Sequence, residues 1–284
     1  LEGADIVDNL LGTTFELFIG GQLIDSQTYE YMADIWQIYM AETPSKGDCI
    51  NNRVSKTDGN FFPLHFFFCD HGMYLNLVGL QYHEVEVRIT WGPHIENIPN
   101  LFPWANYVWL DDGQRNYLAQ NHIDTLITQV KRVTYNTDQI FQLRYFNHPI
   151  KAFFFGTGAT STNLLTDYWS FEKAKMTLNG EVFFEELSPT YFYTVQSYHH
   201  TKNANIDFNT SLKCPTNTRF FMYCFGSDVS TYDVGGTFNF SRVEDCKFEI
   251  ENIVNPNNKS ITFYAVNYNI LRVKHGMAGL LFSN

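Results

Sequence analysis

Residues 61–91 read FFPLHFFFCDHGMYLNLVGLQYHEVEVRITW, and this stretch decides the fold class. It opens with an aromatic run, passes through a polar turn that contains a glycine, and ends in an alternating run. In that last run Val85, Val87 and Ile89 point one way, and the charged residues between them point the other. A period of two is typical of a strand with one buried face and one wet face. The stretch therefore predicts two strands at the edge of a β-sandwich, and nothing in it needs a chemical role.

The composition favours an all-β fold. The chain has 284 residues, enough for one large or two ordinary domains. Hydrophobic residues make up 44% and aromatic residues 17%, with 26 Phe and 17 Tyr, and aromatic side chains favour half-buried pleated surfaces. The formal net charge of -11 argues against binding of nucleic acid or of an anionic membrane through a basic face.

The five cysteines predict no disulfide framework. Their number is odd and no CxxC pair occurs, so a reducing compartment is the simpler interpretation. The sequence also lacks an apolar run long enough to predict a membrane-spanning helix. The first residues, Leu1-Glu2-Gly3, contain neither an initiator Met nor a signal-peptide pattern, so we expect a fragment or a chain whose true start is missing.

Local patterns in the first part of the chain predict a hairpin, a helix and a linker. Residues 15–24 form two short runs around Gly20-Gly21, which is a hairpin signal. Ser26 is expected to cap a helix that runs to Met40, and residues 43–60 are expected to form a loop. Residues 93–103 hold three prolines and are the best linker candidate.

After the linker we expect a strand, a helix and then a series of strands. The first strand is expected at residues 104–110, and a helical stripe of apolar residues predicts a helix at 111–133. Asn179-Gly180 is a type I′ hairpin signal, and strands at short spacing with polar turns indicate a sandwich or barrel. The later strands are expected at residues 140–146, 151–155, 171–178, 181–187, 191–198, 219–225, 237–240, 246–251 and 261–273.

Paired acids and histidines are weighed against ordinary surface roles. Glu84 and Glu86 share one strand face, as a glycosidase pair would, but beside Arg88 they are expected to be solvent-facing residues. Adjacent acids such as Glu185-Glu186 are expected to point to opposite faces of a strand, so they should not share one substrate. We expect no catalytic residue.

The other motifs predict neither a metal nor a cofactor. His199-His200 resembles a metal pair, yet adjacent histidines lack the spacing that brings both to one metal, so a polar strand-end or loop role is expected. Cys224 lies in an aromatic strand and is expected to be a buried, inert thiol. Asn209 and Asn258 begin N-glycosylation triplets, which arise often by chance.

Seven blocks of the sequence, in order, resemble the double jelly-roll major capsid proteins of nucleocytoplasmic large DNA viruses. The resemblance is greatest to the algal-virus and mimivirus-like branch, and it extends over nearly the whole chain. The blocks are FELFIGGQLID (15–25), residues 61–91, YVWLDDGQRNYLAQNHIDTLITQV (107–130), FNHPIKAFFF (146–155), TLNGEVFFEELSPTYFYTVQSYHH (177–200), GGTFNFSRVEDCKFEI (235–250) and YAVNYNILRVKHGMAGLLFSN (264–284).

Within these blocks a set of residues carries the family signature, and each is expected to have a structural role. They are Gly20, Gly21, Gln81, Tyr82, His83, Glu84, Asn147, His148, Pro149, Asn179, Gly180, Asn239, Phe240, Ser241, Arg242, Asn267, Tyr268, Asn269, Leu271, Arg272, Gly276, Met277 and Gly279.

The resemblance implies two jelly rolls and a structural function. Residues 1–92 are expected to form the C-terminal part of a first jelly roll, 93–103 a linker, and 104–284 a second jelly roll. The family's chain begins well before residue 15, so the first jelly roll is expected to be incomplete. Family members form trimers whose six jelly rolls make a pseudo-hexagonal capsomer, and capsomers tile an icosahedral shell.

The same resemblance implies the partners and the location. We expect a homotrimer, neighbouring capsomers and minor capsid proteins as partners, with no direct nucleic acid and at most indirect contact with an internal virion membrane. The protein is expected in the virion, after assembly in the host cytoplasm.

Two alternatives stay open. One is a truncated capsid paralogue that acts as a minor capsid or assembly-scaffold protein. The other is a carbohydrate-binding or cupin-type jelly roll, which would need converging histidine and glutamate ligands or an aromatic groove with acids.

Overall fold

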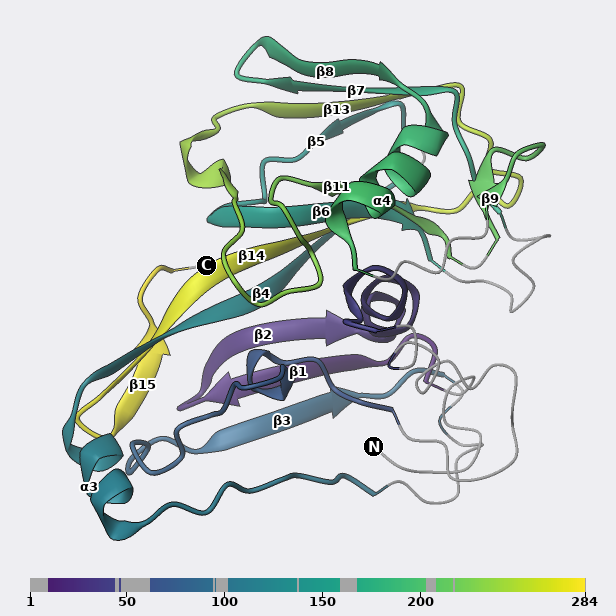
Figure 1. Ribbon diagram of the computed structural model, residues 1–284. Helices are drawn as coiled ribbons and strands as arrows, with labels where there is room; N and C mark the ends of the chain where they lie inside the picture. Colours follow the sequence, from purple (N-terminus) through teal and green to yellow (C-terminus); the bar gives the residue numbers. More distant parts are fainter. Residues whose placement is uncertain are drawn as a thin grey trace. The chain divides into compact units, whose positions relative to one another are not determined.

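The computed structural model describes residues 10–43, 46, 62–93, 95, 102–136, 138–158, 168–202, 208–216 and 218–283. Most of the predicted loop at 43–60 and most of the predicted linker at 93–103 lie outside these residues. Antiparallel strands dominate the described part of the chain, and the predicted all-β class is confirmed (Figure 1).

The chain divides into two compact units that alternate along the sequence. The first comprises Leu1–Met32, Ile50–Gln129 and Tyr268–Asn284, and the second comprises Ala33–Cys49 and Val130–Asn267. This division differs from the predicted one, because the last residues of the chain belong to the first unit. The predicted division assigns 1–92 to one domain and 104–284 to the other, with 93–103 as the linker between them. It stays a prediction.

The first unit contains a three-stranded antiparallel sheet. Its strands are β1 (Thr14–Ile19), β2 (Gln22–Thr28) and β3 (Val85–Thr90), in the order β2-β1-β3. The predicted hairpin is confirmed, because Ile19 pairs with Gln22 across the glycine turn. Alternate residues of β1 are fully buried, as the period-two pattern requires.

Three local predictions in the first unit are wrong. The aromatic run before residue 70 is no strand: it has extended backbone and then a short 3-10 helix, η2 (Phe67–Cys69). Residues 104–110 are extended without strand pairing in the described part of the chain. Ser26 lies inside β2 and caps no helix, and the π-helix η1 spans Tyr31–Met40. The register of β2 with β1 runs to Thr28, which explains the later start.

The predicted helix at 111–133 is wrong for most of its length. Helix α3 spans only Asp112–Gln120, and strand β4 spans Ile123–Tyr135. A capping box between Asp111 and Gln114 starts the helix, and the extended backbone of Asn121 ends it. The β-branched residues after it suit a strand better than a helix, so the apolar stripe of the sequence was a coincidence.

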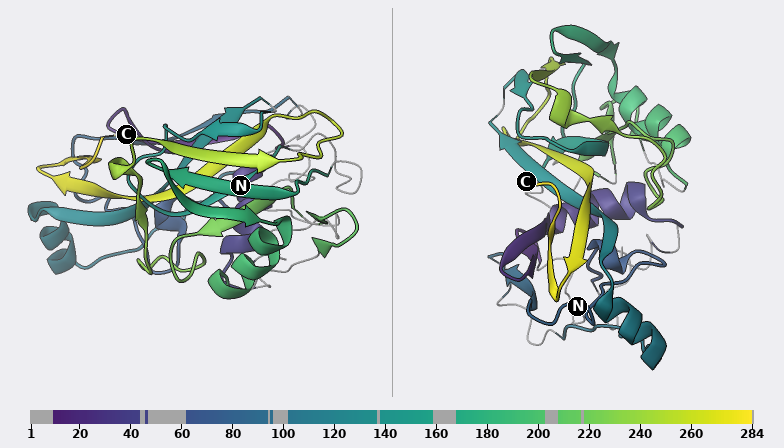
Figure 2. Two further views of the ribbon diagram at one scale, coloured as in Figure 1. Left: turned by 90° about the horizontal axis from the view of Figure 1, so that it is seen from above. Right: turned by 90° about the vertical axis from the view of Figure 1, so that its left-hand side faces the viewer.

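In the described residues, the second unit contains a small two-stranded sheet (β9 and β10), short helices, and strands of two larger antiparallel sheets. A four-stranded sheet has the order β5-β13-β7-β8. A six-stranded sheet contains β11-β6-β14-β15, with β12 beside β6 and β4 beside β14, and its strand β15 belongs to the first unit. Strands β4 and β14 each run from one unit into the other, and Figure 2 follows β14, the long yellow strand, as it turns back into β15.

The remaining elements have these bounds: β5 (Ile140–Gln142), β6 (Pro149–Thr157), β7 (Lys173–Leu178), β8 (Glu181–Leu187), η4 (Tyr191–Val195), α4 (Gln196–His200), β9 (Phe208–Asn209), β10 (Cys214–Pro215), β11 (Phe220–Cys224), β12 (Phe238–Asn239), η5 (Phe240–Arg242), β13 (Cys246–Glu251), β14 (Ile261–Lys274) and β15 (Met277–Leu280).

Aromatic rings fill the space between the two sheets of the second unit. Phe155 on β6 is fully buried, and its ring centroid lies 4.8 Å from that of Phe248 on β13. Phe221 and Phe263 contact it from the neighbouring strands at 5.7 and 6.0 Å. Such rings bury large areas and interlock at defined angles, so this cluster is the main core of the unit.

The predicted strand at 191–198 is helical. It forms η4 and α4, so His199 and His200 end a helix instead of a strand. The reason is tertiary packing, because Phe192 is fully buried with its ring 5.2 Å from Phe155 and 5.7 Å from Phe184. An aromatic segment favours a strand by propensity, and burial against other rings overrides that preference.

Candidate functional site

Several signature residues of the first unit meet, together with Gln22, in one cluster of turns. We call Gly20, Gln22, Tyr82, His83 and Gly276 the glycine–histidine cluster. The N–H of Gly20 donates to the carbonyl of Glu84 at 2.9 Å, and the N–H of Tyr82 donates to that of Gly276 at 2.9 Å. The cluster therefore ties the β1–β2 turn and the segment before β3 to the turn before β15.

His83 is the centre of this cluster. The backbone N–H of Ala278 donates to Nδ1 of His83 at 3.1 Å, and a Cβ on Gly20 would lie 2.3 Å from the same nitrogen. Gly20 and Gly21 have φ of +57° and +79°. At Gly20, glycine is therefore required twice, once by its backbone and once by the imidazole ring.

The other glycines of this region behave differently. A Cβ on Gly276 would lie 2.6 Å from the Tyr82 ring and 3.2 Å from Cβ of Gln81, and φ there is +78°. A Cβ on Gly279 would lie 3.4 Å from Oε1 of Gln22, an ordinary contact distance, and this oxygen accepts the N–H of Leu280 at 3.2 Å. Met277 is 48% exposed and pairs with Lys274.

Asn269 holds the end of the chain against β4. Its Nδ2 donates to Oε1 of Gln129 at 2.9 Å and to the carbonyl of Phe282 at 3.0 Å. Leu271 and Tyr268, its signature neighbours, are 1% and 4% exposed. A buried amide with these partners fixes the register of β14, the strand that carries Asn269.

Arg272 on β14 pairs with Asp124 on β4. Its Nε and Nη2 donate to the two carboxylate oxygens at 2.8 and 2.7 Å, and His122 Nε2 lies 2.7 Å from Oδ1. The hydrogen bonds from Arg272 hold the pKa of the Asp124 carboxyl well below its usual range, with a smaller contribution from His122. This fork is bidentate, which gives geometric specificity.

The signature residues of the second unit lock β6 to the turn after β12. The N–H of His148, whose φ is +67°, donates to Oγ of Ser241 at 2.9 Å, and its carbonyl accepts the N–H of Phe240 at 3.1 Å. Asn239 pairs with Pro149 and caps the next turn by accepting the N–H of Ser241 at 3.0 Å.

Arg242, Asn267 and Asn147 are the remaining signature residues of the second unit. Arg242 is exposed, and Asn267 is fully buried and pairs with Ile150. Asn147 precedes His148, and its Oδ1 is buried without a hydrogen-bond partner.

The Asn179-Gly180 turn joins β7 to β8 as predicted. The two residues have φ of +50° and +85°, which suits a type I′ turn. Oδ1 of Asn179 also accepts the N–H groups of Glu244 and Asp245 at 2.9 and 3.1 Å. Asn179 therefore fixes the loop before β13 as well as its own hairpin.

The paired acids form ion pairs on the surface. Glu86 bonds to Arg88 at 2.9 Å, and both side chains are exposed. Glu185 and Glu186 bond to Lys175 and Lys173 at 3.6 and 3.2 Å. These two lysines lie on one face of β7, so the expectation that the two glutamates point to opposite faces is wrong. The register irregularities of β7 with β8 and the positive φ of Glu186 explain the difference.

Histidines and cysteines form no metal site in the described ranges. There, no three His, Cys, Asp or Glu side chains gather closely enough to hold an ion. Cys224 is buried, its Sγ donates to the carbonyls of Lys151 and Gly226, and burial raises the pKa of the thiol to about 11. Such a thiol stays protonated near neutral pH and is a poor nucleophile.

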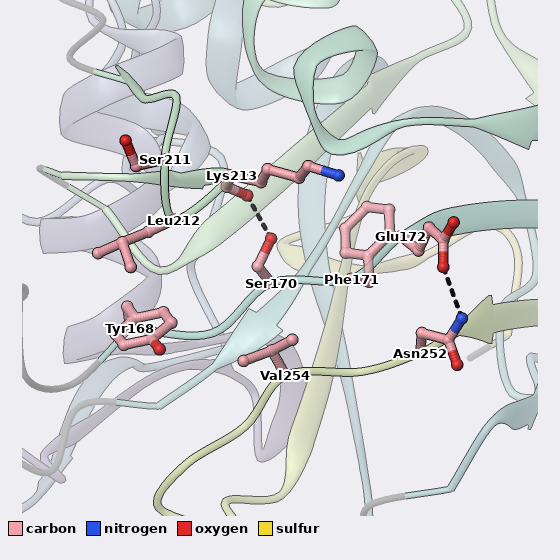
Figure 3. A pocket seen from close by; sticks show the side chains of 9 residues that line it. All are labelled: Tyr168, Ser170, Phe171, Glu172, Ser211, Leu212, Lys213, Asn252 and Val254. Atoms are coloured by element: carbon pink, nitrogen blue, oxygen red, sulfur yellow. Dashed lines mark hydrogen bonds between the residues drawn. The ribbon is translucent and has the colours of Figure 1, made fainter.

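One shallow groove lies in the second unit (Figure 3). The carboxylate of Glu172 already accepts a hydrogen bond from Nδ2 of Asn252 at 2.6 Å, and Oγ of Ser170 donates to the carbonyl of Lys213. Glu172 is the one acidic residue among those that line the groove, so the lining contains no pair of carboxylates for acid–base catalysis. The lining residues are Tyr168, Ser170, Phe171, Glu172, Ser211, Leu212, Lys213, Asn252 and Val254.

The glycosylation candidates lie at different depths. Asn209 on β9 is half-buried, and its Oδ1 accepts the N–H groups of Ser211 and Leu212, both at 3.0 Å. Asn258 is exposed in a turn with φ of +47°. Modification of either residue stays a prediction.

Sequence reasoning missed a buried ion pair in the second unit. Arg219 Nη1 lies 3.8 Å from the carboxylate of Asp34, and the two side chains are 3% and 2% exposed. Thr218 Oγ1 donates to the carbonyl of Asp34 at 2.8 Å. No local pattern signals this pair, since its members lie far apart in the chain. The hydrogen bonds and close contacts of the signature residues support structural roles for them.

Two family sequence models match the chain. The one described as "Large eukaryotic DNA virus major capsid protein" matches residues 113–279, and the one described as "Major capsid protein N-terminus" matches residues 4–111. Together they account for most of the chain.

Individual relatives agree with these matches. The major capsid protein of Pyramimonas orientalis virus is 27% identical, over 95% of this chain and 76% of the relative. That of Paramecium bursaria Chlorella virus 1 is also 27% identical, over 95% of this chain and 78% of the relative. A quasi-atomic structure of the PBCV-1 virus capsid has a TM-score of 0.78 at 22% identity, over 98% of this chain and 84% of that chain. This likeness shows the double jelly-roll fold. In the described part of the chain, no helix has both the length and the apolar character needed to cross a membrane.

Proposed function

The chain belongs to the major capsid proteins of large eukaryotic DNA viruses, and we propose that three copies of it form a capsomer of an icosahedral shell. Three chains of two jelly rolls each supply six similar sandwiches around a threefold axis. A near-sixfold outline packs in flat arrays by symmetric repetition. The signature residues carry this proposal, because they fix turns and registers of a scaffold and form no reactive constellation.

The physics of the fold supports a structural function. The buried aromatic rings around Phe155 make a rigid core, and interlocked rings resist deformation. Positive-φ turns and side-chain caps, such as those at Gly20 and Asn179, define the ends of the strands. A building block that repeats many times in a shell needs one well-defined shape.

The proposed partners are other copies of the chain, neighbouring capsomers and minor capsid proteins. The net charge of -11 means that contacts between capsomers need cationic groups or apolar patches to offset repulsion. Direct contact with nucleic acid is not part of the proposal. We place assembly in the host cytoplasm, which fluorescence microscopy of tagged protein in infected cells tests.

The oligomeric state is the direct test. Mass photometry of the purified chain should give a particle of three times 33.0 kDa, and negative-stain electron microscopy should show a pseudo-hexagonal outline. A monomer at micromolar concentration would contradict the trimer.

A minor capsid or scaffold role is the second candidate within the same family. Membership of the family sets the fold of the chain and does not set its copy number in a virion. Quantitative mass spectrometry of purified virions separates the two roles. A major capsid protein should be the most abundant chain, whereas a minor protein should be present in far fewer copies.

A further inference from the structure

The second unit repeats the hairpin of the first unit in the same register. Strands β7 and β8 begin and end 159 residues after β1 and β2, since Lys173–Leu178 corresponds to Thr14–Ile19 and Glu181–Leu187 corresponds to Gln22–Thr28. Each turn has two consecutive residues with positive φ. β1 and β7 also share one burial pattern, in which every second residue is buried. The two hairpins are therefore equivalent.

The third strand and the following helix continue this equivalence. β13 (Cys246–Glu251) lies 161 residues after β3 (Val85–Thr90), and it pairs with β7 as β3 pairs with β1. The sheet order β2-β1-β3 thus recurs as β8-β7-β13. A helix follows each hairpin, η1 after β2, and η4 with α4 after β8. We call η4 and α4 together the 191–200 helix, and Figure 1 labels its second half α4.

Helix η1 is covered on all sides. Each of its residues is buried or half-buried, and Tyr39 near its end is fully buried. The Tyr39 ring lies 5.5 Å from that of Phe154, and its hydroxyl donates to the carbonyl of Phe220 at 2.6 Å. Although η1 follows a hairpin of the first unit, it belongs from Ala33 onward to the second unit, as Phe154 and Phe220 do. The second unit therefore receives the helix that follows the hairpin of the first.

Tyr198 is the counterpart of Tyr39, and it is exposed. At the offset of 159 residues that relates the hairpins, Tyr39 corresponds to Tyr198. Gln37 corresponds in the same way to Gln196, so the two helices agree in sequence as well as in position. Tyr198 is 80% exposed, and its ring lies 5.0 Å from that of the next residue, His199. The same tyrosine is thus enclosed after one hairpin and open to solvent after the other.

Tyr198 belongs to an apolar stripe on the 191–200 helix. Tyr191, Val195 and Tyr198 recur at the spacing i, i+4, i+7, which places them on one face of a helix. Val195 is 39% exposed and Tyr191 is half-buried, whereas Phe192 and Gln196 on the opposite face are buried. A helix with apolar residues on its exposed face as well as on its buried face is typical of a docking element.

We propose that the exposed stripe of the 191–200 helix packs into the first unit of a second copy, as η1 packs into the second unit of its own chain. The inference rests on the proposed trimer, in which first and second units alternate around a ring. Because the hairpins and their helices are equivalent, the packing of η1 within one chain has a counterpart between chains. Each copy donates one helix and accepts one, and head-to-tail contacts of this kind close into a ring when the rotation matches.

Sedimentation velocity on the full natural chain tests the inference. The unaltered chain is compared with Tyr198→Ser and with the control Tyr145→Ser, whose tyrosine is 72% exposed elsewhere in the second unit. Tyr198→Ser should raise the concentration at which half of the chains are trimeric at least about 30-fold, because each interface loses a central aromatic anchor. Tyr145→Ser should change this concentration less than about threefold.

The outcomes separate this inference from the proposed trimer. A Tyr198→Ser chain that trimerises as tightly as the unaltered chain overturns the inference and leaves the trimer intact, whereas an unaltered chain that is monomeric at micromolar concentration overturns both. Melting of the dissociated chains distinguishes the two equivalent tyrosines. Tyr39→Ser should lower the melting temperature, because Tyr39 is buried, and Tyr198→Ser should leave it unchanged. Equal losses in the two variants would contradict the inference, since Tyr198 would then be covered by its own chain.

Photo-crosslinking tests the docking surface even if Tyr198→Ser fails to fold. Thr194→benzoylphenylalanine alters an exposed residue beside the stripe and keeps the three apolar side chains of the stripe. In a trimer assembled from nitrogen-15-labelled and unlabelled chains, the crosslink should join a labelled chain to an unlabelled one and should reach a peptide of the first unit. Crosslinks that lie only within single chains, or that consistently reach the second unit of another copy, would overturn the assignment.

Discussion

Replacing Gly20 with alanine tests how the glycine–histidine cluster holds the first unit. The added Cβ would lie 2.3 Å from Nδ1 and 2.4 Å from Cγ of His83, distances that no real contact tolerates. The imidazole must therefore move, and its hydrogen bond from the N–H of Ala278 is lost. Gly21 is the matched control, because its φ is also positive and nothing lies within 4 Å of its added Cβ.

The two substitutions differ in cost. A left-handed backbone costs an L-residue about 1–2 kcal/mol, and this strain applies at both positions. Gly20→Ala adds a displaced ring at about 0.5–1.5 kcal/mol and a lost hydrogen bond at about 0.5–1.5 kcal/mol. We therefore expect Gly20→Ala to lower the free energy of unfolding by about 2–5 kcal/mol and Gly21→Ala by about 1–2 kcal/mol.

Urea denaturation followed by tryptophan fluorescence measures both values, and a double-mutant cycle with His83→Ala isolates the contact. In the His83→Ala background, Gly20→Ala should cost no more than Gly21→Ala, with a coupling energy of about 1 kcal/mol or more. Equal costs for Gly20→Ala and Gly21→Ala in the unaltered chain would refute the reasoning, since the ring contact would then contribute nothing.

Three further predictions concern the two cores and the surface fork. Phe155→Ala should lower the free energy of unfolding by about 3–5 kcal/mol and the melting temperature by about 6–20 °C in calorimetry, whereas Phe282→Ala, at a 52% exposed side chain, should cost under about 1 kcal/mol. Leu271→Ala on β14 should lower the free energy of unfolding by about 2–5 kcal/mol and abolish the soluble trimer. An unchanged trimer peak in size-exclusion chromatography would contradict the burial of β14. The lowered pKa of Asp124 stabilises the fold above the ordinary carboxyl pKa of about 4, and this contribution is lost as the pH falls through the folded-state pKa. Asp124→Asn should therefore melt below the unaltered chain at pH 7, and a melting difference that stays constant down to pH 2 would count against the fork.

Turn chemistry and strand periodicity were predictable from the sequence. The Gly20-Gly21 and Asn179-Gly180 turns have the positive φ values that their residues favour, and β8 has the predicted bounds. The residues of a two-residue hairpin interact locally, so they act the same way whatever surrounds them. The family signature was predictable as a set, but the contacts of His83 were not, because its partners lie at both ends of the chain.

Segments that suit either a helix or a strand were not predictable. Residues 123–135 carry a helical stripe and form β4, while the aromatic residues 191–198 form a helix. A short apolar run satisfies both periods, and its partners then decide. Phe192 lies among buried rings, which a helix at this place allows.

By itself, the sequence determined an all-β fold, the positions of its tight turns and a structural class of function, since these follow from composition, local patterns and ordered signature blocks. Only the tertiary structure decided that residues 268–284 belong to the first unit, that Glu185 and Glu186 share a face, and that Asp34 meets Arg219 in a buried pair. The physical reason is that each of these depends on contacts between residues distant in the chain, or on a local irregularity of pairing, and neither leaves a periodic trace in the sequence.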